Sequence, residues 1–291
     1  MQETYYKDKM KRTLTLITAA LLLLSFAASA QKKQVSEELK VMSYNIRLAI
    51  GNDGTNSWKY RYPATGLMID DQKPDVFGVQ EAMYEQIRFL EDNFRDYDNV
   101  GVGRDDGKKK GEFMSIFWNK KTVRMIKSGT FWLSETPEKP SMGWDAACMR
   151  TATWALMQDK KTGNRFYFVN THLDHVGKEA QKNGLALIVN KIKEMNDEGY
   201  PMVLTGDFNI RPDNPALKEL DSIMNSTRKI ALKTDNHRTF NNWGKEKSAA
   251  IIDYIYVSGF SSCLEYQTVT KKYADRSFIS DHYPIFARLI F

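Results

Sequence analysis

Residues 204–209, Leu-Thr-Gly-Asp-Phe-Asn, place a carboxylate and an amide two positions apart, directly after the apolar run Met202–Leu204. That run predicts a short buried strand. Because residues two apart in extended backbone point the same way, Asp207 and Asn209 should stand over one spot beyond the strand. The carboxylate can orient or deprotonate a water, and the amide can donate to an anion without adding negative charge. The pair suits hydrolysis of a phosphate ester, although Asp, Asn and Gly are also typical of a plain turn.

Two more polar residues end predicted strands. Asn45 interrupts the apolar run 40–46, where a buried amide must find partners, either by capping a turn or by holding a metal ligand or its water. Glu81 follows the predicted strand 75–79. A carboxylate that leaves a buried strand is costly unless it is paired or bound to a cation, and Mg2+ takes such ligands. The alternative for Glu81 is a helix N-terminal charge favoured by the macrodipole.

Histidines occupy similar positions. His172 follows the predicted strand 165–170 and could donate to a phosphate oxygen or to the departing oxygen, or could be a hydrogen-bonded structural residue. Asp253 lies inside the strongly β-forming run 251–257 and needs a partner there. His282, in the segment Ser-Asp-His before the predicted final strand 284–290, can supply one. A buried Asp that fixes a His tautomer and supports its charged form is a recurrent catalytic pairing.

Taken in order, these motifs resemble the endonuclease/exonuclease/phosphatase superfamily, and the resemblance extends from about Val41 to Leu289. The superfamily contains deoxyribonucleases, deadenylases, repair endonucleases, inositol-polyphosphate phosphatases and sphingomyelinases. The resemblance implies a four-layer α/β sandwich, with two packed central β-sheets flanked by helices and the site at one edge. The motifs that carry it are Asn45, Glu81, His172, Asp207-Phe208-Asn209, Asp253 and Asp281-His282.

The resemblance also implies a metal site. Glu81 resembles the principal Mg2+ ligand, with Asn45 beside it, and Asp281 resembles a residue near the metal, bound directly or through water. Mn2+ is the expected substitute. Arg47 departs from the repair endonucleases, which carry an acidic residue two positions after the asparagine. That departure argues against a repair enzyme, or at least against its arrangement of metals.

The reaction residues follow in the same way. Asp207 resembles the residue that orients or activates the attacking water, and Asn209 resembles a phosphate-binding amide. His282 resembles the histidine that contacts the scissile phosphate, with Asp253 polarising it. His172 resembles the strand-end histidine of the deoxyribonuclease and deadenylase branches.

Arg150 and several aromatic residues are further candidates for substrate binding. Arg150 could bind a phosphate bidentately or pair with a carboxylate such as Asp145, and we favour the phosphate contact. Aromatic side chains in predicted loops could stack on a base or sugar, or could pack on their own loops: Phe131, Trp132, Trp144 and Trp243. Two cysteines, Cys148 and Cys263, do not make a disulfide scaffold, and whether they pair stays open.

The elements that must position these residues alternate many strands with a few helices. Apolar residues at helical spacing predict helices over 83–94 and 178–196. Further strands are predicted over 113–118, 123–127 and 151–157. No repeat or composition break marks a second domain.

Residues 1–30 have the pattern of a signal peptide. Lys11 and Arg12 precede an apolar run, and Ala28-Ser29-Ala30 fits a cleavage site. Met10 is an alternative start. We therefore expect an exported, periplasmic or extracellular protein with one catalytic domain over 31–291 and no integral membrane span after cleavage. The formal net charge is +6, and removing the +2 of residues 1–30 leaves about +4 for the mature chain, which tolerates polyanions without requiring one.

The predicted function is a metal-dependent phosphodiester hydrolase, with a nuclease (endonuclease or 3'-5' exonuclease) favoured and nucleic acid as its substrate. The same chemical core could serve a phosphomonoesterase, an inositol-phosphate phosphatase or a sphingomyelinase, because loops choose the substrate. A non-catalytic binding module is the alternative of another class. No protein partner is evident from the sequence.

Overall fold

The computed structural model describes residues 38–245, 247 and 250–291. The predicted leader and the predicted domain boundary after residue 30 lie outside these residues. Within them, no helix combines the length and the apolar character needed to cross a bilayer.

One mixed sheet contains the first strand of the described chain. Its strand order is β11-β12-β1-β2-β4-β3, with β1 parallel to β2 and antiparallel to β12. The bounds of the strands are β1 Glu38–Asn45, β2 Val76–Gln80, β3 Tyr97–Val100, β4 Ile116–Asn119, β11 Ser262–Thr268 and β12 Ile285–Ile290.

The second sheet has the order β5-β6-β7-β8-β10-β9, and β7 and β8 are its parallel pair. Neighbouring β10 runs antiparallel to β8. The bounds of the strands are β5 Val123–Trp132, β6 Thr151–Asp159, β7 Arg165–His172, β8 Met202–Asp207, β9 Asn225–Ser226 and β10 Asp253–Ser258.

Alternation along the strands builds the layers. In β1, Leu39 and Val41 belong to the cluster between the sheets, whereas Met42 and Tyr44 belong to the cluster beneath the helices. The opposite sheet follows the same rule, because strand side chains alternate between the two faces. The central strands therefore bury both faces, which explains their nearly continuous apolar runs, whereas the edge strands β3 and β5 have exposed or half-buried side chains.

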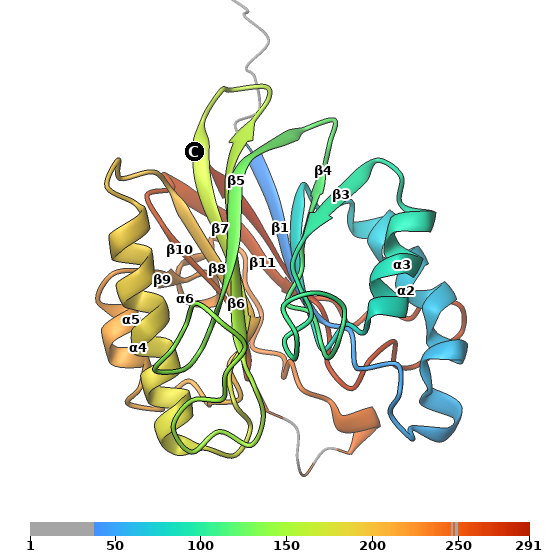
Figure 1. Ribbon diagram of the computed structural model, residues 1–291. Helices are drawn as coiled ribbons and strands as arrows, with labels where there is room; N and C mark the ends of the chain where they lie inside the picture. Colours follow the sequence, from blue (N-terminus) through green and yellow to red (C-terminus); the bar gives the residue numbers. More distant parts are fainter. Residues whose placement is uncertain (1–37, 246, 248–249) are drawn as a thin grey trace, which may run out of the picture. The chain divides into compact units, whose positions relative to one another are not determined.

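Helices cover the outer faces, as Figure 1 shows: α2 and α3 lie on the first sheet, and α4 and α5 on the second. Asp145 caps the start of α4, because its Oδ1 accepts the N–H of Ala180 at 2.7 Å. The bounds are α2 Trp58–Gln72, α3 Tyr84–Asn93, α4 Lys178–Met195, α5 Leu217–Asp221 and α6 Thr227–Ile230, with 3-10 turns η1 Gly54–Asn56 and η2 Asn242–Gly244.

A buried polar network joins the two sheets just below the ends of their strands. Asn170 of β7 donates through Nδ2 to the carbonyls of Val79, at 2.8 Å, and Ser115, at 3.2 Å. Its Oδ1 accepts from Gln80 at 2.6 Å and from Thr205 at 3.1 Å. Each polar atom of the Asn170 amide is therefore used, and the network fixes how one sheet lies on the other.

The predicted four-layer sandwich is confirmed, and two details of the sequence analysis are wrong. Phe131 and Trp132 belong to β5, which is longer than predicted, and both side chains are buried rather than free in a loop. Helix α2 and strands β3 and β11 were not predicted. The apolar residues of α2 do not form a clean stripe, because the buried face of this helix includes Arg61.

Candidate active site

The strand topology brings the polar residues together. Asn45 pairs with Gln80 across the parallel strands β1 and β2, so Glu81 begins beside the end of β1. Parallel β7 and β8 likewise place His172 opposite Asp207. The antiparallel strand β10 starts at the same edge, with Asp253 opposite Asp207.

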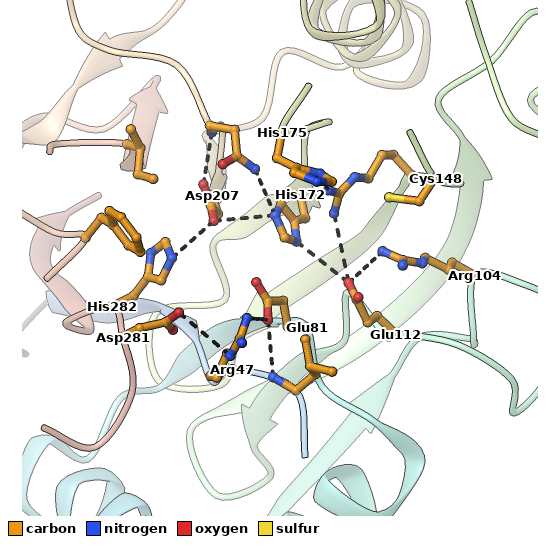
Figure 2. Close-up of a pocket in the computed structure, with 15 residues that line it drawn as sticks. Arg47, Glu81, Arg104, Glu112, Cys148, His172, His175, Asp207, Asp281 and His282 are labelled. Atoms are coloured by element: carbon orange, nitrogen blue, oxygen red, sulfur yellow. Dashed lines mark hydrogen bonds and ion pairs between the residues drawn. The ribbon is translucent and has the colours of Figure 1, made fainter. Parts of the chain in front are cut away.

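These strand ends surround a cavity of about 450 Å3 (Figure 2). Five of the predicted residues, from four segments of the chain, line it: Glu81, His172, Asp207, Asp281 and His282. Asn209 and Arg150 line it as well. Asn45 and Asp253 are buried behind this lining, and each is hydrogen-bonded to a residue that faces the cavity.

Asn45 holds two carboxylates at once. Its Nδ2 donates to Glu81 Oε1 and to Asp207 Oδ2, at 3.0 Å each. Its Oδ1 accepts the backbone N–H of Arg47 at 3.0 Å, which fixes the orientation of the amide. The geometry matches the interpretation of Asn45 as an amide that positions a metal ligand.

Glu81 is further fixed by its backbone. Its φ of 59° lies in the left-handed region, which is uncommon for a residue with a side chain and is found where function demands it. The N–H of Leu48 donates to Glu81 Oε2 at 3.2 Å. The carboxylate is thus held at the cavity wall instead of following the direction of β2.

Arg47 lies between two carboxylates of the cavity. Its Nη1 is 3.7 Å from Glu81 Oε2 and its Nε is 3.8 Å from Asp281 Oδ2, while Asp53 binds the guanidinium with two hydrogen bonds of 3.0 Å. Hydrogen bonding by Asp53 raises the pKa of Arg47. Arg47 therefore supplies a permanent positive charge at the position where the repair endonucleases carry an acidic residue.

The donors present suit a hard divalent cation. Glu81, Asp207 and Asp281 offer carboxylate oxygens at one cavity, and a Glu81–His172–Asp207 group has ligand atoms within 4.8 Å of one another. Oxygen donors of this kind fit Mg2+ or Mn2+. Burial raises the pKa of Asp281, and the positive charge of His282 opposes that increase. A bound cation would act in the same direction as His282 and would favour the charged carboxylate.

His282 is held in its protonated form by two aspartates. Its Nδ1 is 2.8 Å from Asp253 Oδ2, and its Nε2 is 3.6 Å from Asp207 Oδ2. Burial by itself lowers the pKa of His282, but Asp253 and Asp207 raise it, to about 10. The imidazolium then presents its Nε2 proton toward the cavity at neutral pH.

Asp207 lies at the centre of the site. Burial raises the pKa of Asp207, as does the negative charge of Asp253, to about 7. A carboxyl group with a pKa near neutrality is suited to accept a proton from water at physiological pH. The predicted role of Asp207 as the water-activating residue is consistent with this environment.

His172 is neutral, in contrast to His282. Burial lowers the pKa of His172 well below its usual value, and the nearby Arg150 lowers it further. Asn209 Nδ2 donates to the carbonyl of Leu173 at 3.1 Å and lies 3.0 Å from His172 Nε2. Since Nδ2 is the donor, Nε2 accepts and the single ring proton is on Nδ1. Both N–H groups of Asn209 are engaged by His172 and Leu173. In this arrangement Asn209 positions His172 and has no N–H left to donate to a phosphate.

Beyond His172 the cavity contains two residues that sequence reasoning missed. Glu112 and Arg104 come from the loop between β3 and β4, and Arg104 Nη1 donates to Glu112 Oε2 at 2.6 Å. Burial raises the pKa of Glu112, and the positive charge of Arg104 offsets part of that increase. Neither residue follows a predicted strand, so the only available signal was an acidic and a basic residue on facing arms of a loop.

Arg150 pairs mainly with Asp174. Its Nε is 3.5 Å from Asp174 Oδ2, and its Nη2 donates to His175 Nδ1 at 2.9 Å. The predicted alternative partner, Asp145, instead caps α4. Arg150 still reaches the cavity, which leaves the predicted substrate contact untested. Cys148 and Cys263 are both free.

Comparison with known proteins identifies the fold and the family. The model of the Endonuclease/Exonuclease/phosphatase family matches residues 42–282. An endonuclease/exonuclease/phosphatase from Bacteroides vulgatus is 36% identical, with a TM-score of 0.82 over 87% of this chain and 98% of that one. A mannosyl-6-phosphatase from Bacteroides thetaiotaomicron is also 36% identical, with a TM-score of 0.82 over 87% of this chain and 100% of that one.

A curated relative from Saccharomyces cerevisiae, a probable RNA exonuclease, is 25% identical over 65% of this chain, which spans 41% of the length of that protein. The family match covers the predicted site from Asn45 to His282. The chain therefore belongs to the Endonuclease/Exonuclease/phosphatase family, whose members are metal-dependent hydrolases of phosphoester bonds.

Proposed function

We propose that this protein is an exported metal-dependent phosphomonoesterase that acts on small phosphorylated alcohols. The observation that carries the hydrolytic assignment is the convergence of Glu81, Asp207 and His282 on one cavity. Its volume of about 450 Å3 suits a small substrate. The similarity of the whole described domain to a mannosyl-6-phosphatase supports a monoester substrate.

In this mechanism, Asp207 aims the attacking water at the phosphorus atom and accepts its proton. The protonated Nε2 of His282 donates to a non-bridging phosphate oxygen, and Asp253 keeps that proton in place. His172 is neutral and is held by Asn209. Its Nε2 lies 3.4 Å from Asp207 Oδ2, so the ring limits how that carboxylate can turn. Preorganised donors of this kind are worth about 3 kcal/mol each in the transition state.

Glu81 and Asp281 would hold Mg2+, with Asn45 fixing Glu81. When bound, the cation would withdraw charge from the phosphate and stabilise the departing oxygen.

A nuclease is the second candidate. The relative that is a probable RNA exonuclease supports it, and the net charge of about +4 that remains after removal of residues 1–30 is compatible with a polyanionic substrate. The aromatic residues expected to stack on bases argue against it, because Phe131 and Trp132 are buried and Trp144 packs on the core. Trp243 lies over Arg61, 5.5 Å from ring centroid to guanidinium carbon.

A substrate panel tests the proposal. Purified protein with Mg2+ or Mn2+ is offered a hexose 6-phosphate, inositol phosphates, sphingomyelin, poly(A), RNA and DNA, before and after chelation of the metal. We expect phosphate release from the hexose 6-phosphate to exceed cleavage of any nucleic acid, and chelation to abolish it. Faster cleavage of poly(A) or DNA would instead establish the nuclease. Absence of hydrolysis of every substrate with either metal would favour a binding module.

Export has its own test. The basic, apolar and Ala-x-Ala pattern of residues 1–30 supports cleavage after Ala30. N-terminal sequencing of material recovered outside the cytoplasm should begin at Gln31. A sequence that begins elsewhere, or retention of the whole protein inside the cell, would contradict it.

A further inference from the structure

The half of the cavity beyond His172 is lined by a cluster of three charged side chains, Arg104, Glu112 and Arg150. Their side chains are 14%, 13% and 5% exposed, so the cluster is largely desolvated. Figure 2 shows Glu112 between the ring of His172 and the guanidinium of Arg104. The proposed mechanism uses none of these three residues.

The charges of the cluster are balanced once Asp174, which lies behind Arg150 and outside the cluster, is included. Arg104 pairs with Glu112 at 2.6 Å, and Arg150 pairs with Asp174 at 3.5 Å, so two guanidinium groups face two carboxylates. A second phosphate, or the backbone of a nucleic acid, would need positive charge that is not already compensated. A balanced set of donors and acceptors suits an uncharged polar ligand.

Three buried nitrogens in this half have no hydrogen-bond partner among the described residues, and one of them is Nε of Arg104. The other two are Nδ1 of His172 and Nη1 of Arg150, and each of these two is 3.9 Å from the same atom, Oε2 of Glu112. The tautomer of His172 places a proton on that Nδ1. A buried donor without a partner is destabilising. An alcohol group meets this need, because its oxygen accepts from a donor while its proton goes to the carboxylate.

The position of the cluster suits the alcohol part of a substrate. Only the ring of His172 separates Glu112 from Asp207. Its Nδ1 lies 3.9 Å from Glu112 Oε2, and its Nε2 lies 3.4 Å from Asp207 Oδ2. Apart from the histidines, the one aromatic residue among those lining the cavity is Phe240, which packs on His282 at 4.9 Å between ring centroids. The Glu112 half therefore has no Phe, Tyr or Trp ring on which a base could stack, and its only rings are the imidazoles of His172 and His175.

We propose that Arg104, Glu112 and Arg150 form the subsite for the leaving group and bind its hydroxyls, which makes the preferred substrate a phosphorylated polyol or sugar. This inference rests on the proposed phosphomonoesterase. Glu112 accepts a hydroxyl proton of the substrate, and the two arginines and His172 donate to its oxygens.

The test compares two substrates with the same kind of leaving oxygen, a hexose 6-phosphate and n-hexyl phosphate, which has no other hydroxyl. Glu112→Gln keeps the shape of the side chain but removes its charge. A hydrogen bond to a charged group contributes enough that kcat/KM for the hexose 6-phosphate should fall about 10- to 100-fold. The value for hexyl phosphate should change less than about threefold, since no such bond is lost. Glu198→Gln, an exposed position at the other end of the second sheet, is the matched control.

Product inhibition provides a second readout. In Glu112→Gln, inhibition by the free hexose should weaken while inhibition by inorganic phosphate is unchanged. Arg104→Gln should shift the same ratio of substrates and serves if Glu112→Gln does not fold. An equal fall for both substrates, or an unchanged ratio in both variants, overturns the inference. A wild-type protein that hydrolyses neither monoester would instead overturn the proposed function.

Discussion

Asn45 connects two carboxylates that have different tasks. One amide nitrogen donates to Glu81 and Asp207, so each carboxylate keeps its place while the other changes its charge or ligand. Asp207 also lies 3.6 Å from the imidazolium of His282. Single substitutions here should therefore separate metal binding from proton transfer.

Magnesium titration distinguishes Glu81 from Asp207. Glu81→Gln keeps an acceptor for Asn45 but removes the charge that attracts the cation, so activity should fall and partly recover at high Mg2+. Asp207→Asn cannot accept the proton of water, so its rate should fall about 100-fold or more and stay low at any Mg2+ concentration. Recovery of Asp207→Asn alone would reverse the two roles. Unchanged rates in both variants would place the reaction elsewhere.

A pH profile tests the pairing of His282 with Asp253. Asp253→Asn removes a carboxylate that raises the pKa of His282, while burial continues to lower it. The pKa of the histidine should then fall, although Asp207 still raises it, so a smaller fraction is protonated at pH 7 and the rate should fall, by about 100-fold if the charge is lost completely. Lowering the pH toward 5 should recover part of the loss relative to wild type, because it restores the imidazolium. A variant whose deficit is the same at every pH would contradict a protonated His282.

At the scale of elements, the turn between β7 and α4 is organised by Asp174. This fully buried carboxylate accepts the N–H groups of Gly177 at 2.8 Å, Val176 at 2.9 Å and Ala147 at 3.2 Å. Burial raises the pKa of Asp174, but these bonds lower it, to about 2. The turn thereby connects the β5–β6 loop to the end of the strand that carries His172.

Acid should weaken this turn. Because the pKa of Asp174 is lower in the folded than in the unfolded chain, its contribution is complete above about pH 4 and is lost as the pH falls through about 2. The contribution is about 2 kcal/mol by the same linkage. Asp174→Asn should be less stable than wild type at pH 6 in urea unfolding, and the two should converge toward pH 2. A difference in stability that does not change with pH would show that the charge of Asp174 is unimportant.

At the scale of the whole molecule, the two sheets must keep a fixed relation, because Glu81 follows one sheet and Asp207 ends the other. Asn170 crosses between them with bonds to Val79, Ser115 and Gln80. The packing here is tight, since a Cβ added to Gly78 would lie 2.4 Å from the Asn170 amide. The site edge is thus rigid through packing as well as through hydrogen bonds.

Asn170→Ala tests this connection. The change removes the bonds that Asn170 makes to the buried carbonyls of Val79 and Ser115 and to the Gln80 amide, although Ser115 keeps the N–H of Val79 and Gln80 keeps Ser43. The free energy of unfolding should therefore fall by about 3 kcal/mol. The urea midpoint should drop with an unchanged m-value, because the fold is kept. Asn164→Ala, in the surface turn before β7, is a suitable control. Equal stability of both variants would exclude a role for Asn170 in joining the sheets.

From the sequence alone came the candidate site residues and, through the family resemblance that their motifs carry, the four-layer sandwich that the structure confirms. Apolar runs that end in Asn45, Glu81, His172 and Asp207 predict buried strands with chemistry at their ends, and strand ends of one direction meet at one edge of a sheet. Local pattern carries that information, because the side-chain period of a strand and the composition of its end are both local properties.

Only the tertiary structure decided which residues complete the cavity. Glu112 and Arg104 lie in a loop whose path depends on contacts with distant strands, so no local pattern could place them beside His172. The same holds for Arg47, whose guanidinium reaches both Glu81 and Asp281. Pairing of side chains across a cavity is a long-range property, set by how the two sheets pack, and sequence periodicity does not contain it.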